Sequence, residues 1–176
     1  QYQLRSFQRV ILTCTSTFLL AASYYPSIRS KIAKKNRHMI FQEEISLTPF
    51  PRGFHLITDL VTEVIQSSGI QTGTTQVFIL HTSASLSINE NTDPSVRLDF
   101  ESHLNELVPE NQAYYQHNYE GSDDMPAHIK ASLLGTSVHF PVFSGRPRLG
   151  TWQGIYLGEH RNDGGVRKLV ITVNGA

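Results

Sequence analysis

Three histidines stand at positions where their imidazoles can together bind a metal ion. His117 and His128 bracket the run H-N-Y-E-G-S-D-D-M-P-A-H, which contains three carboxylates, a glycine and a proline. His81 follows the segment V-F-I-L, whose apolar and β-branched residues are typical of a buried strand. Catalytic zinc commonly takes three protein ligands and keeps one position open. We therefore expect His81, His117 and His128 to meet around one divalent metal ion, beside a substrate that carries phosphate.

The spacing of these histidines leaves a second interpretation open. Zinc sites within a single hairpin or helix normally have ligands closer in sequence than His117 and His128. The three side chains can instead be polar histidines whose ring nitrogens form hydrogen bonds at the edge of a sheet. Only their positions in the fold decide between these interpretations.

The residues before His128 are typical of the start of a helix. Residues 122–124 offer acceptors for the first backbone amides, and Pro126 is favoured in a first helical turn. A helix over residues 126–134 places His128 in that first turn. The helix dipole there disfavours an imidazolium and favours the neutral imidazole, which is the form that binds metals.

The remaining elements follow from hydrophobic periodicity and turn residues. One further helix is expected between a cap at Thr58 or Asp59 and a stop at Gly69, and another begins at Asp93-Pro94 and ends at Val108-Pro109. A hairpin turn is expected over residues 159–165 from their composition. The expected strands cover residues 40–47, 54–57, 75–80, 82–91, 137–142, 149–157 and 166–173.

Composition limits the class of protein. The chain has 176 residues, 39% of them hydrophobic, which suits one packed domain. Its single cysteine, Cys14, excludes an internal disulfide framework and a cysteine-rich zinc site. Residues 39–176 hold 8 of the 15 bases and all 15 acids. We expect no nucleic-acid partner, because such binding depends on Lys and Arg that neutralise phosphates.

Residues 1–38 differ from the rest and are expected to be an N-terminal extension of a domain over residues 39–176. They hold seven Lys or Arg residues, no acid and an apolar run at residues 10–22 that is too short to span a membrane. The composition fits a secretory signal or an organelle transit peptide. It also fits sequence upstream of a natural start at Met39, or a surface-anchoring helix. For the domain itself we expect a cytoplasmic location and no membrane contact.

Four motifs identify a resemblance that covers Met39 to Ala176. They are H-T-S-A-S-L-S-I-N-E-N, D-P-S-V-R-L-D, E-G-S-D-D-M-P-A-H-I-K-A-S-L-L-G and L-G-T-W-Q-G-I-Y-L-G-E-H-R, in this order. With these motifs the chain closely resembles the YjbQ family, whose members are often labelled secondary thiamine-phosphate synthase enzymes. The resemblance implies an α+β domain, a two-sheet β-sandwich with flanking helices, and assembly as a homotrimer.

The resemblance also implies site residues. It carries the metal positions over to His81, His117 and His128. The same motifs contain four further candidates for catalytic residues, which are Glu90, Asp99, Gln153 and Arg161.

The implied activity resembles that of thiamine-phosphate synthase, which joins a hydroxymethylpyrimidine diphosphate to a thiazole phosphate and releases pyrophosphate. Departure of pyrophosphate requires positive charge from a metal ion or from a residue such as Arg97, Lys130 or Arg161. Three imidazoles favour zinc, whereas magnesium and manganese accept oxygen ligands more readily. Two alternatives stay open: a metal-dependent hydrolase of another small phosphorylated substrate, with Glu90 as general base, and a non-catalytic trimeric protein that binds a metal or metabolite.

Overall fold

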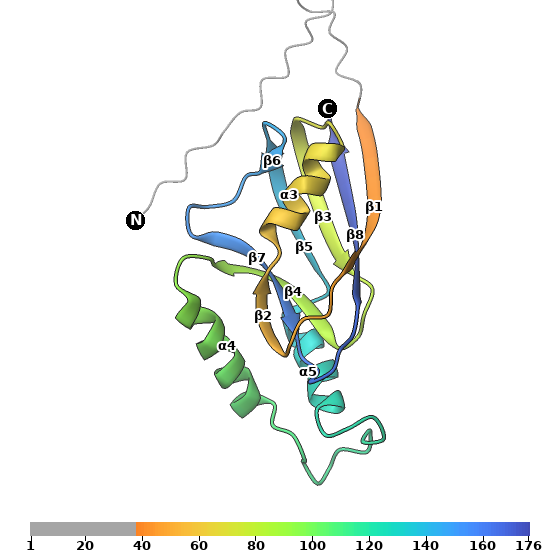
Figure 1. Ribbon diagram of the computed structural model, residues 1–176, viewed down its shortest axis with the longest axis vertical. Coiled ribbons are helices and arrows are strands. Elements are labelled where there is room, and N and C mark those ends of the chain that lie inside the picture. Colours follow the sequence, from red (N-terminus) through yellow and green to blue (C-terminus); the bar gives the residue numbers. More distant parts are fainter. Residues whose placement is uncertain (1–37) are drawn as a thin grey trace, which may run out of the picture. The chain divides into compact units, whose positions relative to one another are not determined.

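The computed structural model describes residues 38–176, which form one domain of antiparallel sheets and α-helices (Figure 1). A five-stranded sheet has the order β1-β8-β3-β5-β6, and a three-stranded sheet has the order β2-β7-β4. The strands are β1 (Met39–Leu47), β2 (Gly53–Leu56), β3 (Thr72–Ile79), β4 (Ala84–Glu90), β5 (Ser137–Phe143), β6 (Arg146–Pro147), β7 (Gln153–Glu159) and β8 (Arg167–Gly175). The helices are α3 (Thr58–Ser67), α4 (Pro94–Leu107) and α5 (Asp124–Leu134).

The expected mixture of helices and strands in one domain is confirmed. The expected roles of residues 1–37 as an extension, address or anchor lie outside the described residues. Among the helices of residues 38–176, none has both the length and the apolar character needed to cross a membrane.

Buried and exposed side chains alternate along the strands of the large sheet, so one face of this sheet packs into the main core. In β8, Leu169, Ile171 and Val173 are buried, and Lys168 between two buried residues is exposed. Ile171 lies opposite Val77 of β3 in the antiparallel register. Helix α3 covers this face through its buried residues, which are Val61, Val64 and Ile65. Because buried residues of both sheets belong to the same cluster, the two sheets share this core.

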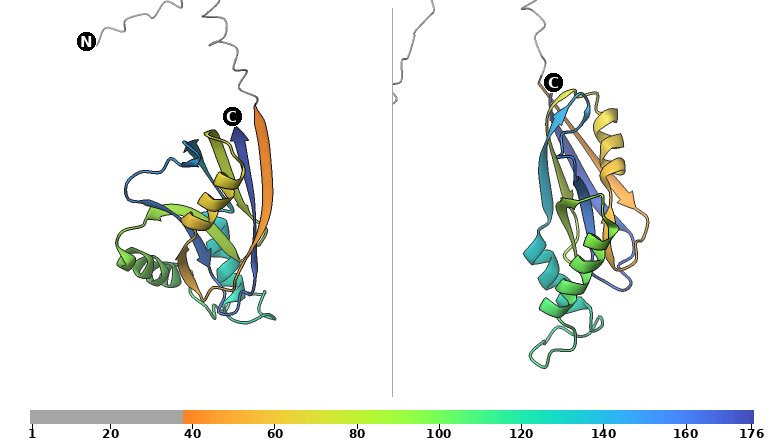
Figure 2. Two further views of the ribbon diagram at one scale, coloured as in Figure 1. Left: turned by 45° about the horizontal axis from the view of Figure 1, so that its top comes forward. Right: turned by 90° about the vertical axis from the view of Figure 1, so that its left-hand side faces the viewer.

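The small sheet carries the other two helices. Helix α4 contacts β2, and α5 contacts β4. Both helices lie toward the end of the domain that is away from the C-terminus (Figures 1 and 2). A second, smaller apolar cluster forms beneath α4 from Phe54, Leu104 and Tyr156. This end of the domain holds most of the residues that the sequence singled out for chemistry.

The ends of the helices agree with the sequence in part. Asp93 caps α4, since its Oδ1 accepts a hydrogen bond of 2.8 Å from the Ser95 amide. Gly135, with φ of 105°, ends α5. The cap expected for α3 is wrong, because no side chain caps this helix. Thr58 instead accepts a 2.9 Å bond from the amide of Ile155 in β7, and so ties α3 to the small sheet.

The hairpin expected at residues 159–165 is also wrong. The strand before it, β7, belongs to the small sheet, and the strand after it, β8, belongs to the large sheet. The segment is therefore a connection between sheets. Turn residues mark where a chain changes direction, but they do not say which strand it pairs with next.

A buried histidine lies in this connection. His160 is 1% exposed, and its Nε2 lies 2.8 Å from Ser85 Oγ on β4. Its Nδ1 has no hydrogen-bond partner among the described residues. Burial, together with the positive charges of Lys130, Arg52 and Arg167, lowers the pKa of His160 to about 3. The fold therefore holds the neutral imidazole.

We expect this histidine to make the domain less stable in acid. The unfolded chain binds a proton at His160 below about pH 6.5, whereas the folded chain does so only near pH 3. The free energy of unfolding should therefore fall as the pH drops below 6.5, by on the order of 2 kcal/mol between pH 7 and pH 5. Urea unfolding at pH 7, 6 and 5 measures this slope. A His160→Gln variant, which does not titrate, should show a shallower slope, and an unchanged slope would contradict the assignment.

Candidate metal centre

Three side chains converge where the loop before α5 meets that helix. One nitrogen each of His117 and His128 and one carboxylate oxygen of Asp124 all lie within 4.8 Å of one another. The His117 Nε2 atom is 2.7 Å from Asp124 Oδ2, and the His128 Nε2 atom is 3.5 Å from Asp124 Oδ1. Asp124 is 1% exposed, whereas the side chains of His117 and His128 are 48% and 31% exposed. The cluster is thus a buried carboxylate with two imidazoles that solvent can reach.

Helix geometry brings Asp124 and His128 together. Asp124 is the first residue of α5, and His128 follows at i+4 on the same face. The expectation that His128 lies in the first turn is wrong by one residue, because the helix starts earlier than Pro126. A contact of 3.0 Å between His128 Nδ1 and the carbonyl oxygen of Thr82 orients the ring. When Nδ1 donates this bond, the lone pair of Nε2 is directed to the cluster, as in many metal sites.

Arg161 holds the carboxylate in place. Its Nη1 donates to Asp124 Oδ1, its Nε donates to Asp123 Oδ2 at 3.0 Å, and its Nη2 donates to the Glu120 carbonyl at 2.7 Å. The Asn162 amide adds a 2.8 Å bond to Asp123 Oδ2. Burial opposes the ionisation of Asp123, but the bonds from Asn162 and Arg161 outweigh it and lower its pKa. Asp123 does not cap α5 as expected, since these partners occupy its carboxylate.

His81 lies outside this cluster. Its Nε2 accepts a 2.8 Å hydrogen bond from the Lys168 amide, and its Nδ1 is 3.3 Å from Arg167 Nη1. Burial and then the charge of Arg167 lower its pKa, so the ring is neutral. Because Nε2 accepts from the Lys168 amide, the single proton of the neutral ring lies on Nδ1, and His81 matches the alternative interpretation of a hydrogen-bonded histidine. Its neighbour Thr82 supplies the carbonyl that orients His128, so this segment supports the cluster without giving it a ligand.

Of the four candidate catalytic residues, one belongs to the site and three lie outside the ligand cluster. Arg161 belongs to the site, as a residue that positions Asp124. Glu90 and Gln153 lie opposite each other at the far end of β4 and β7, and Asp99 is exposed on α4. These three residues are not part of the ligand cluster that residues 38–176 form. Asp124 is the site residue that sequence reasoning missed, although its i, i+4 spacing to His128 was a usable signal.

The comparisons with known proteins lead to one family, and the matches cover most of this domain. Residues 43–176 match the family described as UPF0047 protein YjbQ-like. The chain belongs to the YjbQ (UPF0047) family. The YjbQ protein of Salmonella typhimurium is 54% identical over 138 residues, which cover 78% of this chain and 99% of that protein. A YjbQ-family protein of Synechocystis is 44% identical over 134 residues, which cover 76% of this chain and 91% of that protein.

Solved structures share the fold. A YbjQ-like protein of unknown function from Sulfolobus solfataricus aligns with a TM-score of 0.72 at 26% identity, covering 80% of this chain and all of that one. A YjbQ-family protein from Clostridium acetobutylicum aligns with a TM-score of 0.67 at 39% identity, covering 74% of this chain and 98% of that one. The two-sheet arrangement with its helices is therefore the fold of the YjbQ family.

The residues of this YjbQ-family site suit a divalent ion. Asp124 Oδ2 is a buried oxygen that accepts no hydrogen bond from the described residues, although His117 Nε2 lies 2.7 Å from it. Such an orphaned acceptor is costly unless a cation or a donor satisfies it. Two imidazoles and one carboxylate form a ligand set found in catalytic zinc sites, with a position left for substrate or water.

Proposed function

We propose that this protein is an enzyme that uses a divalent metal ion, held by His117, Asp124 and His128, to act on a small phosphorylated substrate. The observation that carries this proposal is the buried Oδ2 atom of Asp124, which accepts no hydrogen bond within residues 38–176 and lies beside two imidazole nitrogens. Zinc is the ion that this ligand set favours. One of the ligands is a carboxylate, so manganese or magnesium suits this site better than it would suit a site of three histidines.

The reaction that we propose is of the thiamine-phosphate synthase type, in which a hydroxymethylpyrimidine diphosphate and a thiazole phosphate are joined and pyrophosphate leaves. When bound, the ion would supply positive charge for the departing pyrophosphate. The nearby protein cations are poorly placed for this task. Arg161 already donates to Asp123, Asp124 and the Glu120 carbonyl, and Lys130 is fully buried.

The chain's own residues would orient and admit the substrate. Arg161 fixes Asp124, and the Thr82 carbonyl fixes His128. A cavity of about 280 Å³ is lined by His117 together with Tyr115 and other residues of the loop before α5. A second cavity, of about 430 Å³, is lined by His81 and Thr82 together with Leu80 at the end of β3. Both cavities adjoin residues that belong to the cluster or orient it, and their sizes suit small molecules.

We also propose that the two sheets pack as a sandwich and that three copies assemble around the outer face of the large sheet. Phe78 is 39% exposed on this face, and Leu80, two residues further along, is 44% exposed. Phe143 is 56% exposed on the same face, toward the other end of the β3–β5 pair. Large apolar residues exposed along one face of a sheet favour an interaction surface there. Leu80 directly precedes His81, so assembly on this face would also reach one of the two cavities.

A hydrolase is the second candidate, and the exposure of both imidazoles favours it, because water can reach an ion between them. The general base expected for hydrolysis was Glu90. Thr82 contacts the cluster, whereas Glu90 ends β4, which begins at Ala84 and extends roughly 20 Å at about 3.3 Å per residue. Glu90 is therefore poorly placed for this role, and the first candidate is the stronger one.

An assay with both thiamine precursors tests the proposal. The full-length protein, loaded with zinc, manganese or magnesium, is mixed with the pyrimidine diphosphate and the thiazole phosphate, and thiamine phosphate and pyrophosphate are measured. We expect metal-dependent turnover that falls by at least about 100-fold in a His117→Ala variant. A His103→Ala variant, which removes an exposed histidine of α4, is the matched control.

Other results distinguish the alternatives. Equal turnover in the parent and His117→Ala proteins would reject the synthase reaction at this site. Metal-dependent release of phosphate from a panel of phosphate esters, without synthesis, would favour the hydrolase. Bound metal without turnover on either panel would favour the non-catalytic protein.

A further inference from the structure

The first strand of the large sheet has an open edge. Within residues 38–176, strand β1 pairs only with β8, through nine consecutive residue pairs from Met39–Gly175 to Leu47–Arg167. The backbone groups on its other edge form no backbone hydrogen bond within residues 38–176. A regular edge strand of this length is a template on which another strand can pair.

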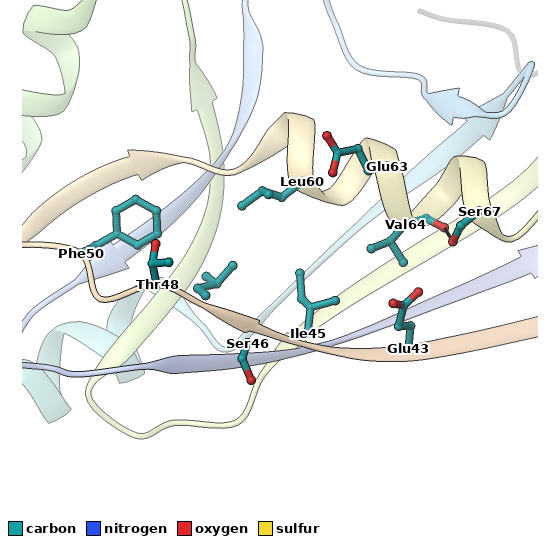
Figure 3. Close-up of a pocket in the computed structure, with 10 residues that line it drawn as sticks. Glu43, Ile45, Ser46, Thr48, Phe50, Leu60, Glu63, Val64 and Ser67 are labelled. Carbon is teal, nitrogen blue, oxygen red and sulfur yellow. Dashed lines mark hydrogen bonds between the residues drawn. The ribbon is translucent and has the colours of Figure 1, made fainter.

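A groove lies along the same strand. It has a volume of about 440 Å³ and runs between β1 and α3 (Figure 3). Its apolar lining comes from both elements and from the loop after β1, and consists of Ile45, Leu47, Phe50, Leu60 and Val64. Leu60 is 40% exposed, so this lining is open to solvent. A strand added to β1 would direct every second side chain toward this groove, since side chains alternate between the faces of a sheet.

The charge of the groove is negative. Glu43 of β1 and Glu63 of α3 line it, and its lining includes no Lys or Arg. Neither carboxylate forms an ion pair within the described residues, whereas the adjacent Glu44, on the opposite face of β1, pairs with Lys168 at 3.0 Å. The groove therefore complements a partner that is apolar and basic on one face.

We propose that β1 and α3 bind an extended peptide segment, which adds to the sheet as a sixth strand and places apolar and basic side chains in the groove. Backbone bonds to β1 would give affinity, and the side chains that face α3 would give specificity. The preferred pattern has apolar residues against Ile45 and Leu60, with Lys or Arg two residues away, beside Glu43 or Glu63. This site is separate from the metal centre and does not depend on the proposed reaction.

A synthetic peptide tests the proposal on the full-length protein. The probe has nine residues, with Lys, Val, Ile and Lys at its even positions and Thr at its odd positions, and carries a fluorescent label. We expect saturable binding with a Kd on the order of 10–100 μM, which weakens at high salt. Hydrogen exchange of the amides in residues 39–47 should slow when the peptide is added.

Matched variants of neighbouring residues separate the groove from general charge effects. Combined replacement of Glu43→Gln and Glu63→Gln should weaken binding about tenfold, since two charge pairs are lost. Glu44→Gln should change it less than about twofold, because this residue faces away from the groove. The folding of each variant is checked by thermal unfolding.

Three outcomes would overturn the proposal. The first is no saturable binding up to 1 mM peptide, and the second is equal weakening by Glu44→Gln. The third is protection of residues 39–47 that rises with protein concentration in the absence of peptide. That last result would assign the edge to a second copy of this chain.

Discussion

Replacing Asp124 with Asn is expected to lower the affinity of the protein for zinc or manganese by at least about 100-fold. Asp124 is the only fully buried member of the cluster that residues 38–176 form, and the only one with a negative charge. An amide in its place keeps the shape but loses the charge that attracts the cation. Competition with a chromogenic chelator, or titration calorimetry, measures the change.

Variants of the three histidines then decide which ligand set is correct. His117→Ala and His128→Ala should each lower the metal affinity strongly, because each removes a nitrogen of the cluster. His81→Ala should leave it within a few-fold, since the lone pair of its Nε2 already accepts from the Lys168 amide and the ring lies outside the cluster. If His81→Ala reduces the affinity as much as His117→Ala does, the cluster of two histidines and Asp124 is the wrong set, and the three-histidine site is restored.

Most elements of the fold could be predicted from local patterns. The buried residues of β8 alternate, and Asp93-Pro94 specifies the start of α4 by its own geometry. The connection at residues 160–166 could not be predicted, because its turn residues fit a hairpin as well as a change of sheet. That choice depends on contacts between distant strands, such as the pairing of β8 with both β1 and β3.

The candidate site was predictable only where a local sequence pattern marked its residues. His117 and His128 were found because histidines that bracket a loop and a helix start are a local signal. Asp124 was assigned to capping, since a carboxylate next to a helix start usually accepts amide bonds. Its actual partner, Arg161, is 37 residues away in sequence. The position of His81 likewise depends on Lys168 and Arg167 of β8, which no local pattern connects to it.

Replacing Arg167 with Met is expected to cost about 3–5 kcal/mol of unfolding free energy, the largest stability effect that we expect. Arg167 begins β8 in the large sheet, and Glu159 ends β7 in the small sheet. Two bonds of 2.7 and 2.6 Å join the Nε and Nη2 atoms of Arg167 to the carboxylate of Glu159, which is 0% exposed. Without Arg167 the carboxylate keeps a 3.0 Å bond from the Arg161 amide but has lost its buried counter-charge.

The loss of unfolding free energy should come mainly from the unpaired buried charge of Glu159, and less from the two hydrogen bonds that are lost. Urea unfolding of an Arg167→Met, Glu159→Leu double variant should therefore show a smaller loss than the Arg167→Met variant alone, because no unpaired charge remains. Lys168→Met is the matched control, since its pair with Glu44 is about half exposed and should contribute less than about 1 kcal/mol. A double variant less stable than the single one would contradict this account, because Glu159 would then stabilise the fold without Arg167, through its bond from the Arg161 amide.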